Sequence, residues 1–228
     1  KTARDSGLQV TVVEKMDRLL ARNLSPRGSE VLAGLLAGKG VRLLAGRSVQ
    51  SIDGSAGSAA IALDDGTRLT AELVLLAIGA RCDTGLAGAA GLQTARGVRV
   101  NAFLQTSSPS IFAGGDIADS GRPAECSARR AAAQGRLAGK NAAAVLLNRP
   151  LQPYIEEAAS LDLKYRDFEL HLAGQGADPD HGCLEIFLED SDGLRYRSVV
   201  QRNGATVGVQ MVGSSTDFQK YAKEIAGS

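Results

Sequence analysis

Two carboxylates follow stretches of sequence that predict buried β-strands, and both are candidates for binding sugar hydroxyls. Glu14 follows the β-branched run Gln9–Val13, and Asp116 follows Ser110–Gly114. An acidic residue at the carboxyl end of such a strand accepts hydrogen bonds from the ribose of a dinucleotide, about 20 residues after a Gly-rich turn. Spacing alone leaves open that Glu14 is only a strand-end carboxylate.

Asp116 follows two glycines and precedes a long predicted helix. Gly114 and Gly115 carry no side chain, so a ligand can approach the backbone there. The helix predicted over Ser127–Leu147 begins soon afterwards, and the free N–H groups of a first helical turn favour electron-rich ligand atoms. We expect the Asp116 carboxylate to accept hydrogen bonds from ligand hydroxyls, although a turn or capping aspartate explains the same residues.

Other residue types argue against several kinds of site. The three cysteines, Cys82, Cys126 and Cys183, are far apart, and the two histidines do not stand at metal-ligand spacing. We therefore expect no metal site, and reduced cysteines in a cytoplasmic protein. The chain shows no apolar run of about 18 residues that predicts a membrane helix, no secretion signal, and, at a net charge of +1, no nucleic-acid-binding surface.

Residues 1–79 predict a strand, a helix and a second strand, the elements of a parallel sheet. Ser25-Pro26 begins the helix, Gly40 ends it, and Val41–Leu44 is the next strand. Glu72–Ile78 is apolar on both faces, which is typical of a central parallel strand that Gly79 ends. Between these elements, three short strands predict an antiparallel meander at 48–53, 59–63 and 67–70.

Residues 80–150 predict a second partial α/β unit. A short helix is expected at Thr84–Ala90, and strands are expected at Val98–Leu104 and Ser110–Gly114. The Ala-rich helix Ser127–Leu147 follows, and its alanines and glycines allow it to approach a sheet closely.

Residues 151–228 predict a small α+β domain. They carry 7 Lys and Arg against 13 Asp and Glu, whereas residues 1–150 carry 19 against 12, and a Pro-containing segment separates the two parts. Turns of type I′ are expected at Asp192-Gly193 and Asn203-Gly204, and Thr216-Asp217 caps a final helix. Four antiparallel strands are expected at 168–172, 184–189, 195–201 and 206–212.

Several of these stretches together resemble the FAD-dependent pyridine nucleotide–disulfide oxidoreductases. Thr106 followed by Ala113-Gly-Gly-Asp116 is similar to the family's second flavin-binding motif, and Val10–Glu14 is similar to the second strand of its NAD unit. Ala77-Ile-Gly79 with Arg81 resembles the family's crossover between the two units, with Cys82 in place of a proline. The weaker match of residues 155–228 is to the rubredoxin reductase and nitrite reductase branch.

The resemblance implies a set of roles for these residues. Asp116, after Gly115, would hold the ribityl chain of FAD, and N–H groups near Cys126 and Ser127 would face the flavin. Glu14 would hold the NAD(P)H ribose, and Ile78 and Gly79 would line the nicotinamide path. Hydride would pass to FAD, and electrons would pass singly to rubredoxin, a ferredoxin or a nitrite reductase module.

The family's two Gly-rich fingerprints do not occur in this sequence, so the resemblance implies two half-domains of a longer protein. We expect the chain alone not to hold FAD or NADH tightly. We also expect open sheet edges either to be covered by another copy in a homo-oligomer or to be avoided by a rearrangement of the first 150 residues. Two alternatives remain open: a non-catalytic dimerisation or interaction module built on residues 151–228, and a different α/β protein that shares only the Gly-Asp motif.

Overall fold

The computed structural model describes residues 2–55, 57–121, 127–155, 160–164, 169–174, 183–189, 195–213 and 217–227. The chain divides into two compact units. The first unit consists of Lys1–Leu76 with Ala158–Ser228, and the second unit consists of Ala77–Glu157. Within the described ranges, none of the helices combines the length and apolar character that crossing a membrane requires.

The first unit begins with the predicted strand, helix and strand. After the short helix α1 (Thr2–Asp5), β1 (Val10–Glu14) and β2 (Val41–Ala45) pair in parallel on either side of α2 (Pro26–Gly38) in the sequence. Ser25 is the N-cap of α2, and its Oγ accepts a hydrogen bond from the Gly28 N–H at 3.2 Å. The prediction for this segment is confirmed.

The antiparallel meander is also confirmed. It consists of β3 (Val49–Ser55), β4 (Ser58–Leu63) and β5 (Arg68–Ala71), in that order across the sheet. Gly54 is required where β3 turns into β4, because a Cβ there would lie 2.4 Å from the Ser58 carbonyl oxygen.

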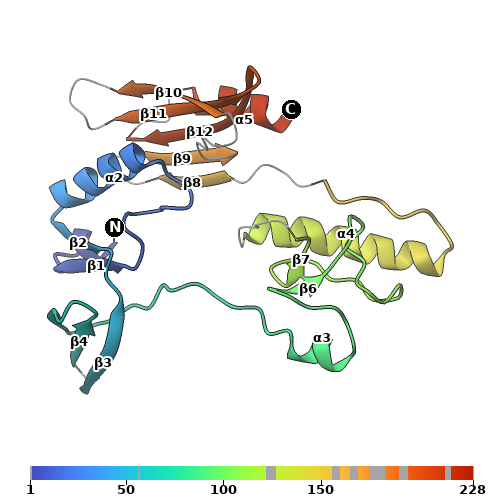
Figure 1. Cartoon of the computed structure of the whole chain (residues 1–228), viewed down its shortest axis with the longest axis horizontal. Helices are drawn as coiled ribbons and strands as arrows, with labels where there is room; N and C mark the ends of the chain where they lie inside the picture. The colour runs from blue at the N-terminus through green and yellow to red at the C-terminus, as the bar shows by residue number, and fades with distance from the viewer. Residues whose placement is uncertain are drawn as a thin grey trace. The chain divides into compact units, whose positions relative to one another are not determined.

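The central parallel strand predicted at Glu72–Ile78 is wrong. The segment is extended but pairs with no described strand (Figure 1), and Leu73, Leu75 and Ile78 are 81%, 87% and 87% exposed. An extended segment becomes a strand of a sheet only when neighbouring strands form hydrogen bonds with its backbone groups. Its apolar side chains indicate only that the segment is suited to the interior of a sheet.

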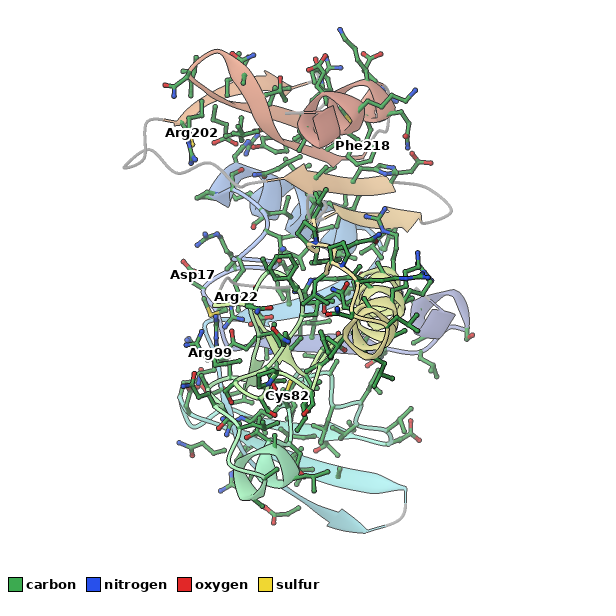
Figure 2. All side chains as sticks on the ribbon, turned by 90° about the vertical axis from the view of Figure 1, so that its right-hand side faces the viewer. Asp17, Arg22, Cys82, Arg99, Arg202 and Phe218 are labelled. Carbon is green, nitrogen blue, oxygen red and sulfur yellow. The ribbon has the colours of Figure 1, made fainter. Side chains whose placement is uncertain are left out.

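The C-terminal part of the first unit is a five-stranded antiparallel sheet in the order β10-β11-β12-β9-β8 (Figure 1). The strands are β8 (Ser160–Lys164), β9 (Glu169–Gly174), β10 (Cys183–Glu189), β11 (Tyr196–Arg202) and β12 (Ala205–Val212), and α5 (Phe218–Gly227) follows. Phe218 of α5 (Figure 2) packs in one apolar cluster with Val209 and Met211, and α2 packs through a second cluster that contains Tyr196 and Val212.

The sequence patterns find four of these five strands, and β8 is the strand that they miss. The I′ turn at Asn203-Gly204 is confirmed, since both residues have positive φ, 52° and 79°. Asp192-Gly193 and Thr216 lie outside the described residues.

The second unit contains α3 (Gly85–Ala89), β6 (Val98–Arg99), β7 (Ala118–Asp119) and α4 (Ala128–Leu146). The two predicted helices are confirmed. β6 and β7 pair in parallel over two residues each.

The strand predicted at Val98–Leu104 is confirmed only at Val98–Arg99, and the strand predicted at Ser110–Gly114 is wrong. The chain leaves β6 after Arg99 and turns at Leu104, whose φ of 60° is incompatible with a strand. Ser110–Gly114 forms only an isolated bridge between Gln105 and Phe112, so the regular strand comes after Asp116 rather than before it.

Candidate functional site

The Gly114–Asp116 turn lies against the first half of α4. A Cβ on Gly114 would lie 3.1 Å from the backbone carbonyl of Gln134, and one on Gly115, whose φ is 84°, would lie 3.4 Å from the Ala131 Cβ. The Gly115 N–H donates to Gln134 Oε1 at 2.9 Å. The absence of side chains at Gly114 and Gly115 therefore allows α4 to pack closely against the turn. This finding corrects the expectation that the two glycines leave room for a ligand.

Asp116 is exposed at the end of this turn. Among the residues that the structure describes, no hydrogen bond or ion pair reaches its carboxylate. A free carboxylate on a turn that α4 holds in place can accept hydrogen bonds from hydroxyl groups of a ligand.

Ser127 is the N-cap of α4. Its Oγ accepts a hydrogen bond from the Arg130 N–H at 3.2 Å, which fixes the start of the helix. Cys126, the neighbouring predicted site residue, lies outside the described residues.

Cys82 contributes a contact that the sequence did not reveal. The Sγ of Cys82, which is labelled in Figure 2, donates to the backbone oxygen of Asp116 at 3.0 Å, and this contact ties the segment after Gly79 to the candidate turn. The sequence predicts only a reduced thiol at this position, and no local pattern signals a hydrogen bond between residues 34 positions apart.

Glu14 lies in the first unit, at the carboxyl end of β1. It is half-buried, and its Oε1 accepts a hydrogen bond from the Met16 N–H at 2.7 Å. Its backbone oxygen accepts from the Arg47 N–H at 3.1 Å, beyond the end of β2. Glu14 thus lies where both parallel strands end, the edge at which open α/β sheets bind ligands.

Ile78 and Gly79 lie in the extended segment at the start of the second unit. Ile78 is 87% exposed and Gly79 has a φ of 85°. Glu14 belongs to the first unit and the other described candidates belong to the second, so the structure groups Ile78, Gly79, Gly115, Asp116 and Ser127 in one unit.

Asp119, three residues after Asp116, is a buried charge in the second unit. The Gly121 N–H donates to its Oδ1 at 2.8 Å, and Arg99 (Figure 2) lies 3.7 Å away. The Gly121 hydrogen bond and then the Arg99 charge lower the pKa of Asp119 below its ordinary value, although burial acts in the opposite direction.

We expect Asp119→Asn to flatten the acid end of the stability profile. Because the folded-state pKa is lowered, the ionised carboxylate stabilises the fold above its ordinary pKa of about 3.9, and this contribution is lost as the pH falls through the folded value. Urea midpoints measured from about pH 7 to about pH 2.5 should fall less steeply for the variant than for the wild type. Parallel profiles would show that Asp119 has no such role, and Asp64→Asn, at an exposed site, is the matched control.

The sequence pattern of the pyridine nucleotide-disulphide oxidoreductases matches residues 1–135, more than half of the chain, and the chain belongs to that family. An NAD(P)H nitrite reductase of Bacillus subtilis (strain 168) is 28% identical to this chain. The match covers 92% of this chain and 26% of the length of that reductase. The ferredoxin reductase component of chlorobenzene dioxygenase from Cupriavidus sp. (strain PS12) is 33% identical over 97% of this chain and 53% of its own length.

Solved structures support the same assignment. Putidaredoxin reductase, in its covalent complex with putidaredoxin, matches with a TM-score of 0.80 and 27% identity over 99% of this chain and 54% of that chain. The predicted α/β class with Rossmann-like units is confirmed. The chain spans between about a quarter and about half the length of these relatives.

Proposed function

We propose that the Gly114–Asp116 turn and the beginning of α4 form part of an FAD site in an NAD(P)H-dependent oxidoreductase. The observation that carries this proposal is the exposed Asp116 carboxylate, free of partners among the described residues, on a turn fixed by Gln134. These residues fit the sugar-alcohol arm of FAD, because an unpartnered carboxylate is a strong hydroxyl acceptor.

In this proposal the chain's own residues bind and orient the flavin. Asp116 accepts hydrogen bonds from the ribityl hydroxyls. The positive end of the α4 dipole, which begins at Ser127, favours negative charge on an electron-rich edge of the flavin ring. When bound, FAD supplies the ability to accept hydride and release single electrons. Glu14 holds the ribose of NAD(P)H, and Ile78 and Gly79 line the approach of the nicotinamide.

The partner in this proposal is an electron carrier or a nitrite reductase module. The relatives' names support that class, since they include a ferredoxin reductase component, a nitrite reductase and a reductase crosslinked to putidaredoxin. We place the protein in the cytoplasm, where the free thiols Cys82 and Cys183 would stay reduced, and we retain the expectation of a homo-oligomer.

Substituting Asp116 tests the FAD site. Titration of FAD into the chain, followed by flavin fluorescence, should give a dissociation constant at least about tenfold higher for Asp116→Ala, because hydrogen bonds to a charged group contribute about 1.5–3 kcal/mol. Weak binding by the wild type is expected, since no Gly-rich pyrophosphate turn occurs in the sequence. Asp64→Ala removes an exposed carboxylate from the other unit and should leave the constant unchanged. Equal affinities for the wild type and Asp116→Ala would refute the site.

A further inference from the structure

We propose that Tyr196 and Gln210, on the C-terminal sheet, are positioning residues for the loop between β1 and α2 (residues 15–25), and so for nucleotide binding at Glu14. The proposal rests on the ribose role proposed above for Glu14. That loop leads directly from Glu14 to the N-cap of α2, and its position depends on what holds each of its two ends.

One end of the loop is held by the parallel sheet. The Met16 N–H donates to the Glu14 carboxylate, and the Met16 carbonyl accepts from the Gly46 N–H at 2.7 Å, just after β2. These two contacts fix the residues nearest the carboxylate.

The other end is held by the C-terminal sheet, through two contacts at Ser25. The Ser25 N–H donates to Gln210 Oε1 at 2.8 Å, and Ser25 Oγ lies 2.6 Å from the Tyr196 hydroxyl. Ser25, Tyr196 and Gln210 are only 7%, 1% and 1% exposed. Polar contacts buried to this degree cannot be replaced by water without rearrangement, so they fix one geometry.

The hydrogen bonds at Tyr196 form a directed chain. The Tyr196 hydroxyl donates its one proton to Glu185 Oε1 at 2.8 Å, so Ser25 Oγ must donate to Tyr196 while accepting from the Gly28 N–H. Ser198 donates to the same Glu185 oxygen at 2.5 Å. This series of hydrogen bonds runs from the positive end of the α2 dipole to the Glu185 carboxylate, and in such a series each hydrogen bond polarises the next. Burial raises the pKa of Tyr196, which keeps its proton on the hydroxyl.

Apolar packing holds the same end of the loop. Leu24 is 3% exposed and belongs to the cluster that contains Tyr196, and Leu19 and Leu20 pack against that cluster. A Cβ on Gly28 would lie 2.9 Å from Tyr196 Cε1, so α2 approaches the ring as closely as a glycine permits. Ser29 Oγ also donates to the Leu19 carbonyl at 2.6 Å, which fastens the loop to α2.

The test compares two tyrosines from which only a hydroxyl is removed. Tyr196→Phe breaks the chain of hydrogen bonds, whereas Tyr221→Phe removes a hydroxyl from α5, in the cluster that Phe218 belongs to. NADH is titrated into the full chain, and backbone amide shifts of residues 14–18 report the dissociation constant even where binding is weak. We expect a constant at least fivefold higher for Tyr196→Phe and within twofold of wild type for Tyr221→Phe.

Two further readouts separate positioning from a general loss of stability. The FAD dissociation constant should be unchanged in Tyr196→Phe, and hydrogen exchange of the amides at 24–29 should be at least tenfold faster than in Tyr221→Phe. Ser25→Thr, which keeps the cap hydroxyl, should bind NADH more tightly than Ser25→Ala.

The outcomes distinguish this proposal from the one on which it rests. An unchanged NADH constant in Tyr196→Phe, or equal weakening in Tyr221→Phe, overturns the positioning role and leaves Glu14 as a ribose-binding residue. A wild-type chain in which residues 14–18 do not respond to NADH overturns the ribose role itself, before any variant is compared.

Discussion

Replacing Asn141 by alanine is expected to lower the unfolding free energy of the second unit by about 3–5 kcal/mol. Asn141 is 1% exposed on the inner side of α4. Its Nδ2 donates to the carbonyls of Phe103 and Gln152, both at 2.8 Å, and its Oδ1 accepts from the Gln152 N–H at 2.9 Å. The alanine variant leaves three backbone groups without their partner, at a cost of about 1–3 kcal/mol for each one that stays buried.

Hydrogen exchange of the α4 amides measures this loss within the second unit. Lys140→Ala, at the exposed neighbouring position, is the control and should change the stability by less than about 0.5 kcal/mol. A loss below about 1 kcal/mol for Asn141→Ala would mean that water replaces the side chain, and that Asn141 does not hold the loop around Leu104 and the segment at Gln152 to α4.

Replacing Gly97 by alanine is expected to cost about 2–4 kcal/mol and to displace the candidate turn. A Cβ on Gly97 would lie 2.3 Å from the carbonyl oxygen of Ile117. That oxygen accepts from the Val98 N–H at 2.8 Å and lies one residue beyond Asp116, so relieving the clash must move either β6 or the turn.

Gly88 provides the matched control for Gly97. A Cβ there meets nothing within 4 Å, and the residue lies inside α3, where alanine is favoured over glycine by about 0.5–1 kcal/mol. Urea denaturation should therefore show a lower midpoint for Gly97→Ala and an equal or higher midpoint for Gly88→Ala. A fall of the same size in both variants would contradict the assigned clash.

Sequence patterns correctly predict the helix starts and turns that depend only on residues close together in the sequence. Ser25 and Pro26 specify the start of α2, the Asn203-Gly204 pair specifies a hairpin, and Ser127 begins α4. Each of these depends on backbone geometry within a few residues, which the residue types encode directly.

Elements that depend on distant partners are not predictable in this way. The apolar run Glu72–Ile78 is suited to a buried strand, yet the described structure gives it no neighbouring strand. β8 (Ser160–Lys164) alternates polar and apolar residues over only five positions, too short a stretch to identify a strand without β9, which pairs with it. A sequence pattern indicates that a segment is suited to be a strand, but it does not identify the strand that pairs with it.

The candidate site follows the same division. Sequence reasoning found Asp116 and the helix beside it, but it explained the glycines by a ligand when α4 occupies that space. The spacing of Gln134 and Asn141 could have revealed their structural roles, because two amide side chains seven residues apart lie on one face of a helix. Both side chains are buried. The contact from Cys82 depends on the tertiary structure alone.

Mapping FAD onto the chain by backbone amide shifts is the most direct test of the central claim, that the exposed carboxylate of Asp116 receives the ribityl arm of FAD beside the first turn of α4. The account predicts that FAD shifts the amides of Gly115, Asp116 and the residues following Ser127 first. In Asp116→Ala, the same shifts should require an FAD concentration at least about tenfold higher. Shifts confined to the first unit, or a turn and helix start that do not respond to saturating FAD, would contradict the account.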